Sequence, residues 1–414
     1  MNLLRYRSLV GLFGLVVAGW AAALPAPAQT FLRPEIFRKL GQGSLGCPFC
    51  SDLGGTTLTG DVNQASMVLF GTLGNARLDP NGDFGAGQTD LSIAHVIWKN
   101  DKDGNKSAKE FLGDKKVITL PRYIPGEKDN KVKWLVFCDV FKGKLDPYRG
   151  LPVKSDEIVP YLTGALAVEK KDNAARLRFF FDWLDHSETE IANDAYKEFA
   201  KAEYKDFQAA AKDLSADKLA KWLQDPNTPA FRLGLYGSML GHSAKPEHAE
   251  LLRKLLDDPQ KRISSGLDGM LAGYILLKPK EGWDYLRAIL GNPNKEFLLR
   301  YAALRAVRFF WETRPDVIKK DDMVDAVCLL LDQSDVADLA IEDLRKWKQS
   351  QVLDKVLELN KKSTHDVPII RRAILRFALD CKDNPKAKQF ADAMRKKDPD
   401  WVKDVEELLK LETR

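Results

Sequence analysis

The sequence predicts a protein of two unlike parts, a small β-barrel followed by an α-helical solenoid. Residues 47–165 contain short runs in which apolar and polar side chains alternate, separated by turns rich in Asp, Asn, Gly and Pro. From residue 172 to the C-terminus, apolar residues instead recur at spacings of three and four, the period of a helix buried on one face. Similar segments also recur at a fixed distance within this second part, which is typical of stacked repeats.

Composition narrows the class of protein without naming a function. The chain has 414 residues, 44% of them hydrophobic and 30% charged, which excludes wholesale disorder and a multi-span membrane protein. Its length favours two or three domains. The formal net charge of +5 arises from 64 basic and 59 acidic residues, and it is too small to predict a nucleic-acid partner.

The first 28 residues have the pattern of a secretory signal peptide. Arg5 and Arg7 precede an apolar run over residues 8–24, and Ala26-Pro27-Ala28 offers small residues for cleavage after Ala28. We therefore expect an exported protein, periplasmic or extracellular, without stable membrane insertion after cleavage. An uncleaved membrane anchor is the alternative. Residues 29–46, with three glycines and a proline, are predicted to form a linker.

The β-rich module is predicted to span residues 47–165. Its strand candidates are residues 65–73, 89–97, 115–120 and 132–138, and the residues between them are turn formers. Several short strands joined in this way favour a small sandwich or barrel.

The repeats of residues 172–414 are visible as offsets in the sequence. Residues 298–307 align with residues 369–378 at an offset of 71 positions. Residues 231–236 align more loosely with the start of residues 298–307, at an offset of 68 positions. Each offset is near twice 35. Leucines that end helices lie at successive gaps of 39, 33, 34, 41 and 28 residues, 35 on average: Leu184, Leu223, Leu256, Leu290, Leu331 and Leu359. This period predicts about six pairs of antiparallel helices, each pair stabilised by its neighbours.

Two of these segments resemble HEAT repeats. That family has an acidic residue or Asn near the turn between helices, followed by Arg and then by small and aliphatic residues. Asp366 with Arg371-Arg372-Ala373-Ile374-Leu375 matches this order, as does Asn294 with Arg300-Tyr301-Ala302-Ala303-Leu304. The resemblance implies an α-α superhelix with an extended concave surface. The resemblance predicts the architecture of this part but gives little information about its function.

The front module resembles the netrin/tissue-inhibitor type of OB barrel. The likeness rests on an early cysteine pair, the strand Ala65-Ser66-Met67-Val68-Leu69-Phe70-Gly71 and the later Trp134-Leu135-Val136-Phe137-Cys138. The resemblance implies a disulfide from Cys47 or Cys50 to Cys138. It does not imply protease inhibition, because cleavage after Ala28 leaves Cys47 eighteen residues inside the mature chain. The two parts together are similar to uncharacterised exported bacterial proteins that end in HEAT repeats.

The motif Cys47-Pro48-Phe49-Cys50 carries the sharpest chemical signal. It is similar to a glutaredoxin active site, in which a thiol at a helix N-terminus has a lowered pKa. The residues after Cys50 are poor helix formers, which favours a structural disulfide over redox catalysis or metal binding. The residues alone leave the pairing of Cys47, Cys50 and Cys138 open. Cys328 and Cys381 are expected to be small core residues.

No other pattern predicts a catalytic or metal site. The Asx-rich loops at residues 79–90 and 101–112 depart from the calcium-binding pattern and are typical of β-turns. His186 and His365 fall in corresponding turns between helices, where a capping or solvent-facing role is expected. We therefore predict no catalytic residues, no metal, no cofactor and no enzyme activity.

The predicted function is that of a scaffold that binds a protein or peptide along the concave face of the solenoid. The candidate partner-binding residues are predicted to form a basic stripe on this face. The alternative is pairing within the helix turns for Arg300 and Arg371 and solvated helix faces for the others. The candidates are Arg300, Arg305, Arg308, Arg371, Arg372 and Arg376. Two other functions remain open, a thiol-disulfide oxidoreductase that uses Cys47 and Cys50, and a structural component of the cell envelope.

Overall fold

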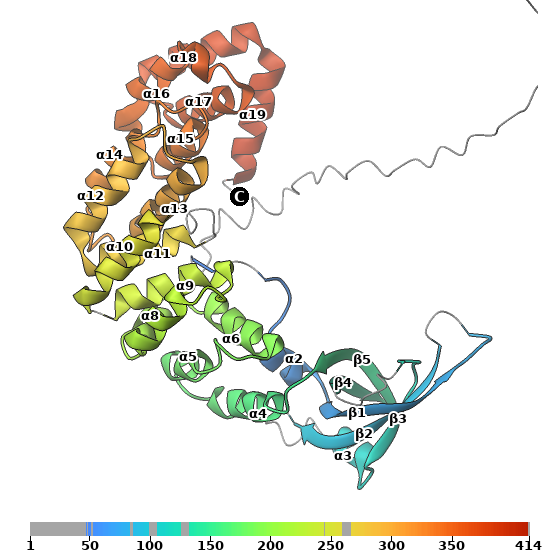
Figure 1. Cartoon of the computed structure of the whole chain (residues 1–414). Helices are drawn as coiled ribbons and strands as arrows, with labels where there is room; N and C mark the ends of the chain where they lie inside the picture. The colour runs from blue at the N-terminus through green and yellow to red at the C-terminus, as the bar shows by residue number, and fades with distance from the viewer. Residues whose placement is uncertain are drawn as a thin grey trace, which may run out of the picture. The chain divides into compact units, whose positions relative to one another are not determined.

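The computed structural model in Figure 1 describes residues 47, 49, 50, 53–82, 86–98, 106–125, 132–243, 245–258 and 266–412. The predicted signal peptide and linker lie outside these residues, as do residues 101–105 of the second Asx-rich loop. Among the described helices, none is both long enough and apolar enough to cross a membrane.

The front part is a five-stranded antiparallel sheet with the order β3-β2-β1-β4-β5. Phe70 in the central strand pairs with His95 on one side and Leu135 on the other. All four predicted strand segments are confirmed, and β5 is an additional strand. The strands are β1 (Met67–Leu78), β2 (Gly87–Ile97), β3 (Val117–Leu120), β4 (Lys133–Phe141) and β5 (Lys144–Val153).

The sheet is open, so the prediction of a closed β-barrel is wrong. Strands β3 and β5 are its two edges and do not pair with each other. Strand β3 has only four residues, and β5 carries Pro147 and Pro152, which have no N–H to donate to a further strand. Both edges are therefore unsuited to close a barrel.

Both faces of the sheet are covered with apolar side chains. On one face, Val68, Phe70 and Phe137 belong to a large core that continues into the helical part. On the other face, Leu69 and Cys138 pack with residues of α3 (Lys106–Leu112). Burial on both faces explains why residues 67–71 form one continuous apolar run instead of alternating.

The described chain after β5 is helical, and its helices are labelled in chain order in Figure 1. Alternate helices lie side by side, with α9 against α11, α11 against α13, and α15 against α17. A short helix, α2 (Leu58–Gln64), precedes the sheet. The later helices are α4 (Ile158–Val168), α5 (Asn173–Phe181), α6 (Thr189–Lys201), α7 (Tyr204–Ala211), α8 (Ala216–Gln224), α9 (Ala230–His242), α10 (Ala249–Asp257), α11 (Leu267–Leu277), α12 (Pro279–Leu290), α13 (Phe297–Thr313), α14 (Lys320–Cys328), α15 (Ala337–Lys346), α16 (Leu353–Leu359), α17 (Pro368–Asp380), α18 (Pro385–Lys397) and α19 (Pro399–Glu412).

Local sequence signals account for many of the helix ends. Asp172, Ser215 and Asn384 each cap a helix by accepting a backbone N–H in its first turn. Helices α12, α17 and α18 begin with proline, whose fixed φ and missing N–H suit the first helical position. These capping residues and prolines lie in the turns between successive helices.

Side-chain contacts between helices recur at a nearly constant distance along the sequence. In the described helical part, hydrogen bonds join five pairs of residues that are exactly 35 positions apart: Arg178–Asp213, Tyr196–Phe231 (backbone carbonyl), Arg300–Asp335, Arg308–Asp343 and Arg345–Asp380. The rings of Trp311 and Trp347 stack at 4.1 Å between centroids. These contacts have the spacing expected of repeated two-helix units.

Helices α9 and α11 make the closest helix contact of the described chain. Their backbones meet through two rows of glycine: Gly234, Gly237 and Gly241 on α9, and Gly266, Gly269 and Gly273 at the start of and along α11. A Cβ on Gly237 would lie 2.8 Å from the Cα of Met270, which is too close for any real contact. Residues 232–242 are all buried, so α9 has no solvent-facing side.

Candidate functional site

The structure contains a disulfide between Cys47 and Cys50, whose Cα atoms are 5.5 Å apart. The pairing with Cys138 implied by the OB-barrel resemblance is therefore wrong. Cys138 is a free, buried thiol on the α3 face of the sheet, whereas Cys47 belongs to the core on the opposite face. Burial raises the pKa of the Cys138 thiol to about 12, so it is unreactive. Cys328 and Cys381 are also free and half-buried.

The segment after the disulfide lies along helix α6. We call the described residues between Cys47 and Leu58 the strap. The backbone N–H of Cys47 donates to the Ala200 carbonyl at 3.2 Å, at the C-terminal end of α6. Further along, the backbone N–H of Leu58 donates to the Asp194 carboxylate at 2.6 Å, and Lys197 contacts the strap between them. Asp194, Lys197 and Ala200 are three residues apart, so they share one face of α6.

Phe49 anchors the strap to the helical part. Its ring lies 4.6 Å from that of Phe309 on α13, and only 4% of Phe49 is exposed. Its carbonyl oxygen approaches α9 so closely that a Cβ on Gly234 would lie 3.0 Å from it. The turn is closed by a backbone hydrogen bond from Cys50 to Cys47. Ala200, Gly234 and Phe309, from three different helices, therefore form a site for this turn, which we call the Phe49 site.

A half-buried tyrosine and a buried histidine support the Phe49 site. Tyr204 packs edge-on against Phe309 at 5.3 Å, and its hydroxyl hydrogen bonds Nε2 of His242 at 2.8 Å. Nδ1 of His242 faces the Ser238 carbonyl, which can only accept, so Nδ1 carries the proton and Nε2 accepts from Tyr204. Burial lowers the pKa of His242 to about 4 and raises that of Tyr204. Both side chains are neutral at pH 7, and the Arg314 guanidinium lies close to the Tyr204 hydroxyl.

Another buried polar group lies where the strap meets α2. The Asp194 carboxylate accepts hydrogen bonds from Leu58 and from the Tyr161 hydroxyl at 2.8 Å. Desolvation outweighs these two bonds and raises the pKa of Asp194 to about 6. The group holds the strap in place, and it faces a phenol that burial keeps protonated.

The cysteine pair lacks the environment of a thiol-disulfide active site. Cys47 is 6% exposed, and Cys50 is half-buried. In the described chain, the first helix after the motif begins at Leu58, so neither sulfur lies at the N-terminus of a helix that would stabilise a thiolate.

The six candidate arginines have different environments. Arg300 is buried and hydrogen bonds Asp335 and Gln333. The others pair as Arg305–Asp268 at 2.8 Å, Arg308–Asp343 at 2.7 Å, Arg371–Asp366 at 3.1 Å and Arg376–Glu342 at 3.3 Å, and Arg376 also pairs with Glu412. Arg372 is exposed. Five of the six therefore have a carboxylate partner within the chain. Pairing was the alternative for Arg300 and Arg371, whereas Arg305, Arg308 and Arg376 are paired where solvated helix faces were the alternative.

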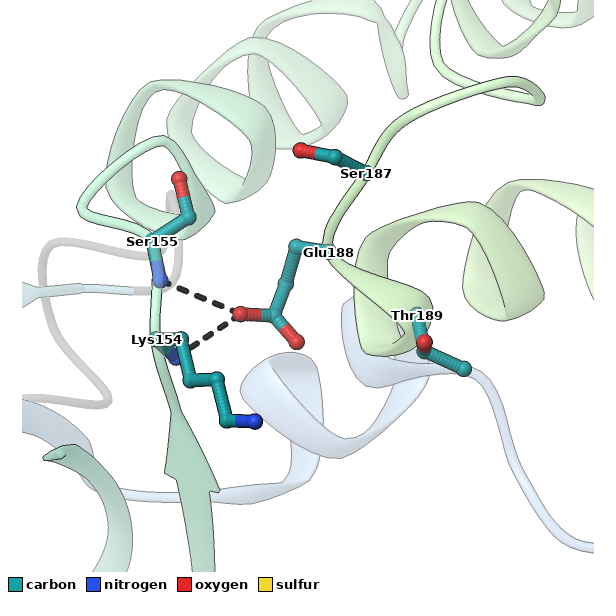
Figure 2. Close-up of a pocket in the computed structure, with 5 residues that line it drawn as sticks. All are labelled: Lys154, Ser155, Ser187, Glu188 and Thr189. Carbon is teal, nitrogen blue, oxygen red and sulfur yellow. Dashed lines mark hydrogen bonds between the residues drawn. The ribbon is translucent and has the colours of Figure 1, made fainter.

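A small pocket lies between the end of β5 and the start of α6, and Figure 2 shows its lining residues. It has a volume of about 380 Å³. The Glu188 carboxylate points into it and accepts the backbone N–H groups of Lys154 at 2.7 Å and Ser155 at 3.0 Å (Figure 2). The Glu188 carboxylate therefore links the end of β5 to the start of α6. Ser187 and Thr189 complete the lining.

The two turn histidines and the first Asx-rich loop make local structural contacts. Nδ1 of His186 accepts the backbone N–H of Glu188 at the start of α6, and Nε2 of His365 contacts the Leu331 carbonyl at 2.8 Å. In the first Asx-rich loop, Asp79 accepts the N–H of Asn81, which forms an Asx turn. Within the described ranges, no group of three or more His, Cys, Asp or Glu residues is arranged to hold a metal ion.

Sequence reasoning missed the partners of the cysteine motif. No pattern in the sequence connects Gly234 to Phe49. Comparisons with protein-family models, with curated proteins and with solved structures find no match.

Proposed function

We propose that this protein is an exported, non-catalytic scaffold that binds a peptide segment of a partner protein through a HEAT-like solenoid. The observation that carries the proposal is the strap. The helices α6, α9 and α13 already hold a non-helical segment by its backbone and by one aromatic anchor. Peptide recognition by helical surfaces uses the same chemistry, buried aromatic anchors together with a few backbone contacts.

The regular contacts support the solenoid part of this proposal. Hydrogen bonds between residues 35 positions apart occur from Arg178 to Asp380, over most of the helical part. Stacks of this kind expose extended surfaces to partners. The HEAT assignment rests on this period and on the sequence resemblance.

The disulfide supports the proposed export. Disulfides persist in oxidising compartments and are rare in the cytosol. Cleavage of the predicted signal peptide leaves Gln29 as the first residue. Mass spectrometry of the protein recovered from the producing cells tests this directly. A cytosolic protein that retains residues 1–28 contradicts the export proposal.

The binding proposal is tested by vacating the Phe49 site. The Phe49→Ala variant removes the anchor but leaves Gly234 and Phe309 in place. We expect a fluorescein-labelled, disulfide-closed peptide of residues 44–52 to bind this variant at least about tenfold more tightly than the wild type, because the wild-type site is filled. Fluorescence anisotropy measures both affinities.

Two controls make the result specific. Phe181 is 4% exposed, like Phe49, but its ring packs on Trp222 at 5.1 Å, so Phe181→Ala controls for the loss of a buried ring elsewhere in the same core. The second control is the same peptide with Ala in place of Phe49. A folded Phe49→Ala protein that fails to bind the Phe peptide, or binds the Ala peptide equally well, contradicts the proposal.

A further inference from the structure

We infer that the Cys47–Cys50 loop is a displaceable occupant of the Phe49 site, and that reduction of its disulfide opens this site to an aromatic side chain of the partner peptide. The inference rests on the proposed function, because it assigns a partner chemistry and a redox control to the same surface. It begins from the observation that the site is filled by a segment of the chain itself.

The chemistry of the site selects an aromatic side chain on a tight turn. Phe309 provides a ring face at 4.6 Å, and Tyr204 packs behind it with its hydroxyl directed to His242. Aromatic pairs at this separation gain more than their buried area alone provides. Gly234 leaves room for the Phe49 carbonyl, because a Cβ at this position would lie only 3.0 Å from the carbonyl oxygen. A partner therefore needs one aromatic anchor and a closely approaching backbone.

The disulfide favours the docked state because it fixes the turn that presents Phe49. With the cross-link, the loop loses little conformational freedom on docking; without it, the same four residues must be ordered by the contact alone. Cys50 is half-buried and Cys47 is buried, so Cys50 is the sulfur that a reductant reaches. A dithiol reductant breaks the S–S bond, yields two protein thiols and is itself oxidised to a disulfide.

Two glycines allow the loop to leave while the remainder of the strap stays in place. Gly54 and Gly55 have φ values of +68° and +71°, and a Cβ on Gly54 would meet nothing within 4 Å. Beyond them, Leu58 remains bonded to Asp194. Gly54 and Gly55 thus form a hinge. On one side of it lies the Cys47–Cys50 loop, and on the other lies the hydrogen bond from Leu58 to Asp194, which does not depend on the disulfide.

The release step is tested by amide hydrogen exchange on the full wild-type protein with and without dithiothreitol. We expect the segment around Cys47 and Phe49 to exchange at least about tenfold faster after reduction, because its docking is weakened. The Leu58 amide, held by Asp194, serves as the internal reference and should not change. The three free cysteines, Cys138, Cys328 and Cys381, contribute no disulfide to reduce. Unchanged exchange at residues 47–50 overturns the inference.

The opening of the site is tested with a labelled peptide of residues 44–52 that keeps Phe49 and carries Ser at both cysteine positions. Reduction should increase its affinity for wild-type protein by about tenfold. The Cys47→Ser/Cys50→Ser double variant should bind with the higher affinity whether or not dithiothreitol is present. The Phe49→Ala variant should also bind under both conditions.

The outcomes separate this inference from the proposed function. If Phe49→Ala binds the peptide but reduction leaves wild-type binding unchanged, the site stands and its redox control is wrong. If Phe49→Ala does not bind the peptide at all, both the site and its control are wrong. A response to dithiothreitol that persists in the double cysteine variant also overturns the inference, because it then arises elsewhere in the chain.

Discussion

Neighbouring helices of the helical part are joined in two different ways. Between α9 and α11 the contact is backbone on backbone, made by glycines. Between α13, α15 and α17 it is made by arginine–aspartate pairs 35 residues apart, Arg300–Asp335, Arg308–Asp343 and Arg345–Asp380. Close backbone packing thus stabilises the helix contact in one region, and arginine–aspartate pairs contribute to it in the other.

The strap contacts the first of these two regions. Phe49 reaches α9 at Gly234, and residues 232–242 of that helix are buried. Buried charged groups occur in both regions, because Arg232 on α9 and Asp268 on α11 are buried, and so is Asp343, the partner of Arg308. The glycine region differs in that no side chains separate the two helix backbones, so the strap docks onto a tightly packed pair of helices.

The largest expected effect comes from filling the glycine contact. A Cβ at position 269 would overlap the carbonyl oxygen of Gly234, which is backbone and cannot move aside independently. We therefore expect Gly269→Ala to lower the free energy of unfolding by about 3 kcal/mol or more. Urea denaturation measures this change.

Gly74 provides the matched control for this substitution. It lies in β1, its φ is not positive, and a Cβ there meets nothing within 4 Å. Gly74→Ala should change the free energy of unfolding by less than about 0.5 kcal/mol. Equal effects of the two substitutions would show that the α9–α11 contact is not tight.

The next effect is the pH dependence caused by His242, which lies behind the Phe49 site. Its pKa is about 4 in the folded protein, below the ordinary 6.5, so the unfolded chain binds the proton more tightly. His242 therefore stabilises the fold above pH 6.5, and this contribution is lost as the pH falls from 6.5 towards 4. Between pH 7 and pH 4 the loss is on the order of 3 kcal/mol.

The measurement compares wild type with His242→Gln, which keeps a donor and an acceptor but does not titrate. Asp194 acts in the opposite direction, because its raised pKa of about 6 adds stability as the pH falls through that value. The wild-type curve alone therefore conceals the effect, and the difference between the two proteins isolates it. A difference that does not depend on pH would contradict a buried, neutral His242.

A smaller effect separates two arginines that occupy the same repeat position. Arg300 and Arg371 are 71 residues apart, yet the side chain of Arg300 is 5% exposed and that of Arg371 is 43% exposed. We expect Arg300→Met to cost about 2 kcal/mol, because it leaves buried Gln333 without its partner. Arg371→Met should cost less than about 0.5 kcal/mol. Thermal denaturation compares them, and equal costs would remove the distinction between buried and exposed pairs.

Much of the fold could be predicted from local patterns. Short apolar or alternating runs bounded by turn residues identified four strands, and the offset of 71 located α13 and α17, because these patterns arise from burial of side chains. Strand β5 escaped detection because Pro147 and Pro152 interrupt it. Closure of the sheet could not be predicted, since it depends on which edges can accept a further strand.

The candidate site was less predictable than the fold. The motif of Cys47 and Cys50 stood out in the sequence, but its partners Ala200, Gly234 and Phe309 are more than 150 residues away. The sequence predicts only that an apolar residue such as Phe309 is buried in the core. No pattern in the sequence specifies which segment covers it. The arginines were easier to find than their partners. Their spacing and the pair Asp366–Arg371 were visible in the sequence, but the aspartates that pair with Arg300, Arg305 and Arg308 were not identified.

The central claim, that Phe49 is seated on α13, is tested most directly by a double-mutant cycle between Phe49 and Phe309. The free energy of unfolding is measured for wild type, Phe49→Ala, Phe309→Leu and the double variant. The ring contact at 4.6 Å predicts a coupling energy of about 1 kcal/mol. Additivity of the two substitutions within about 0.3 kcal/mol would contradict the docked strap.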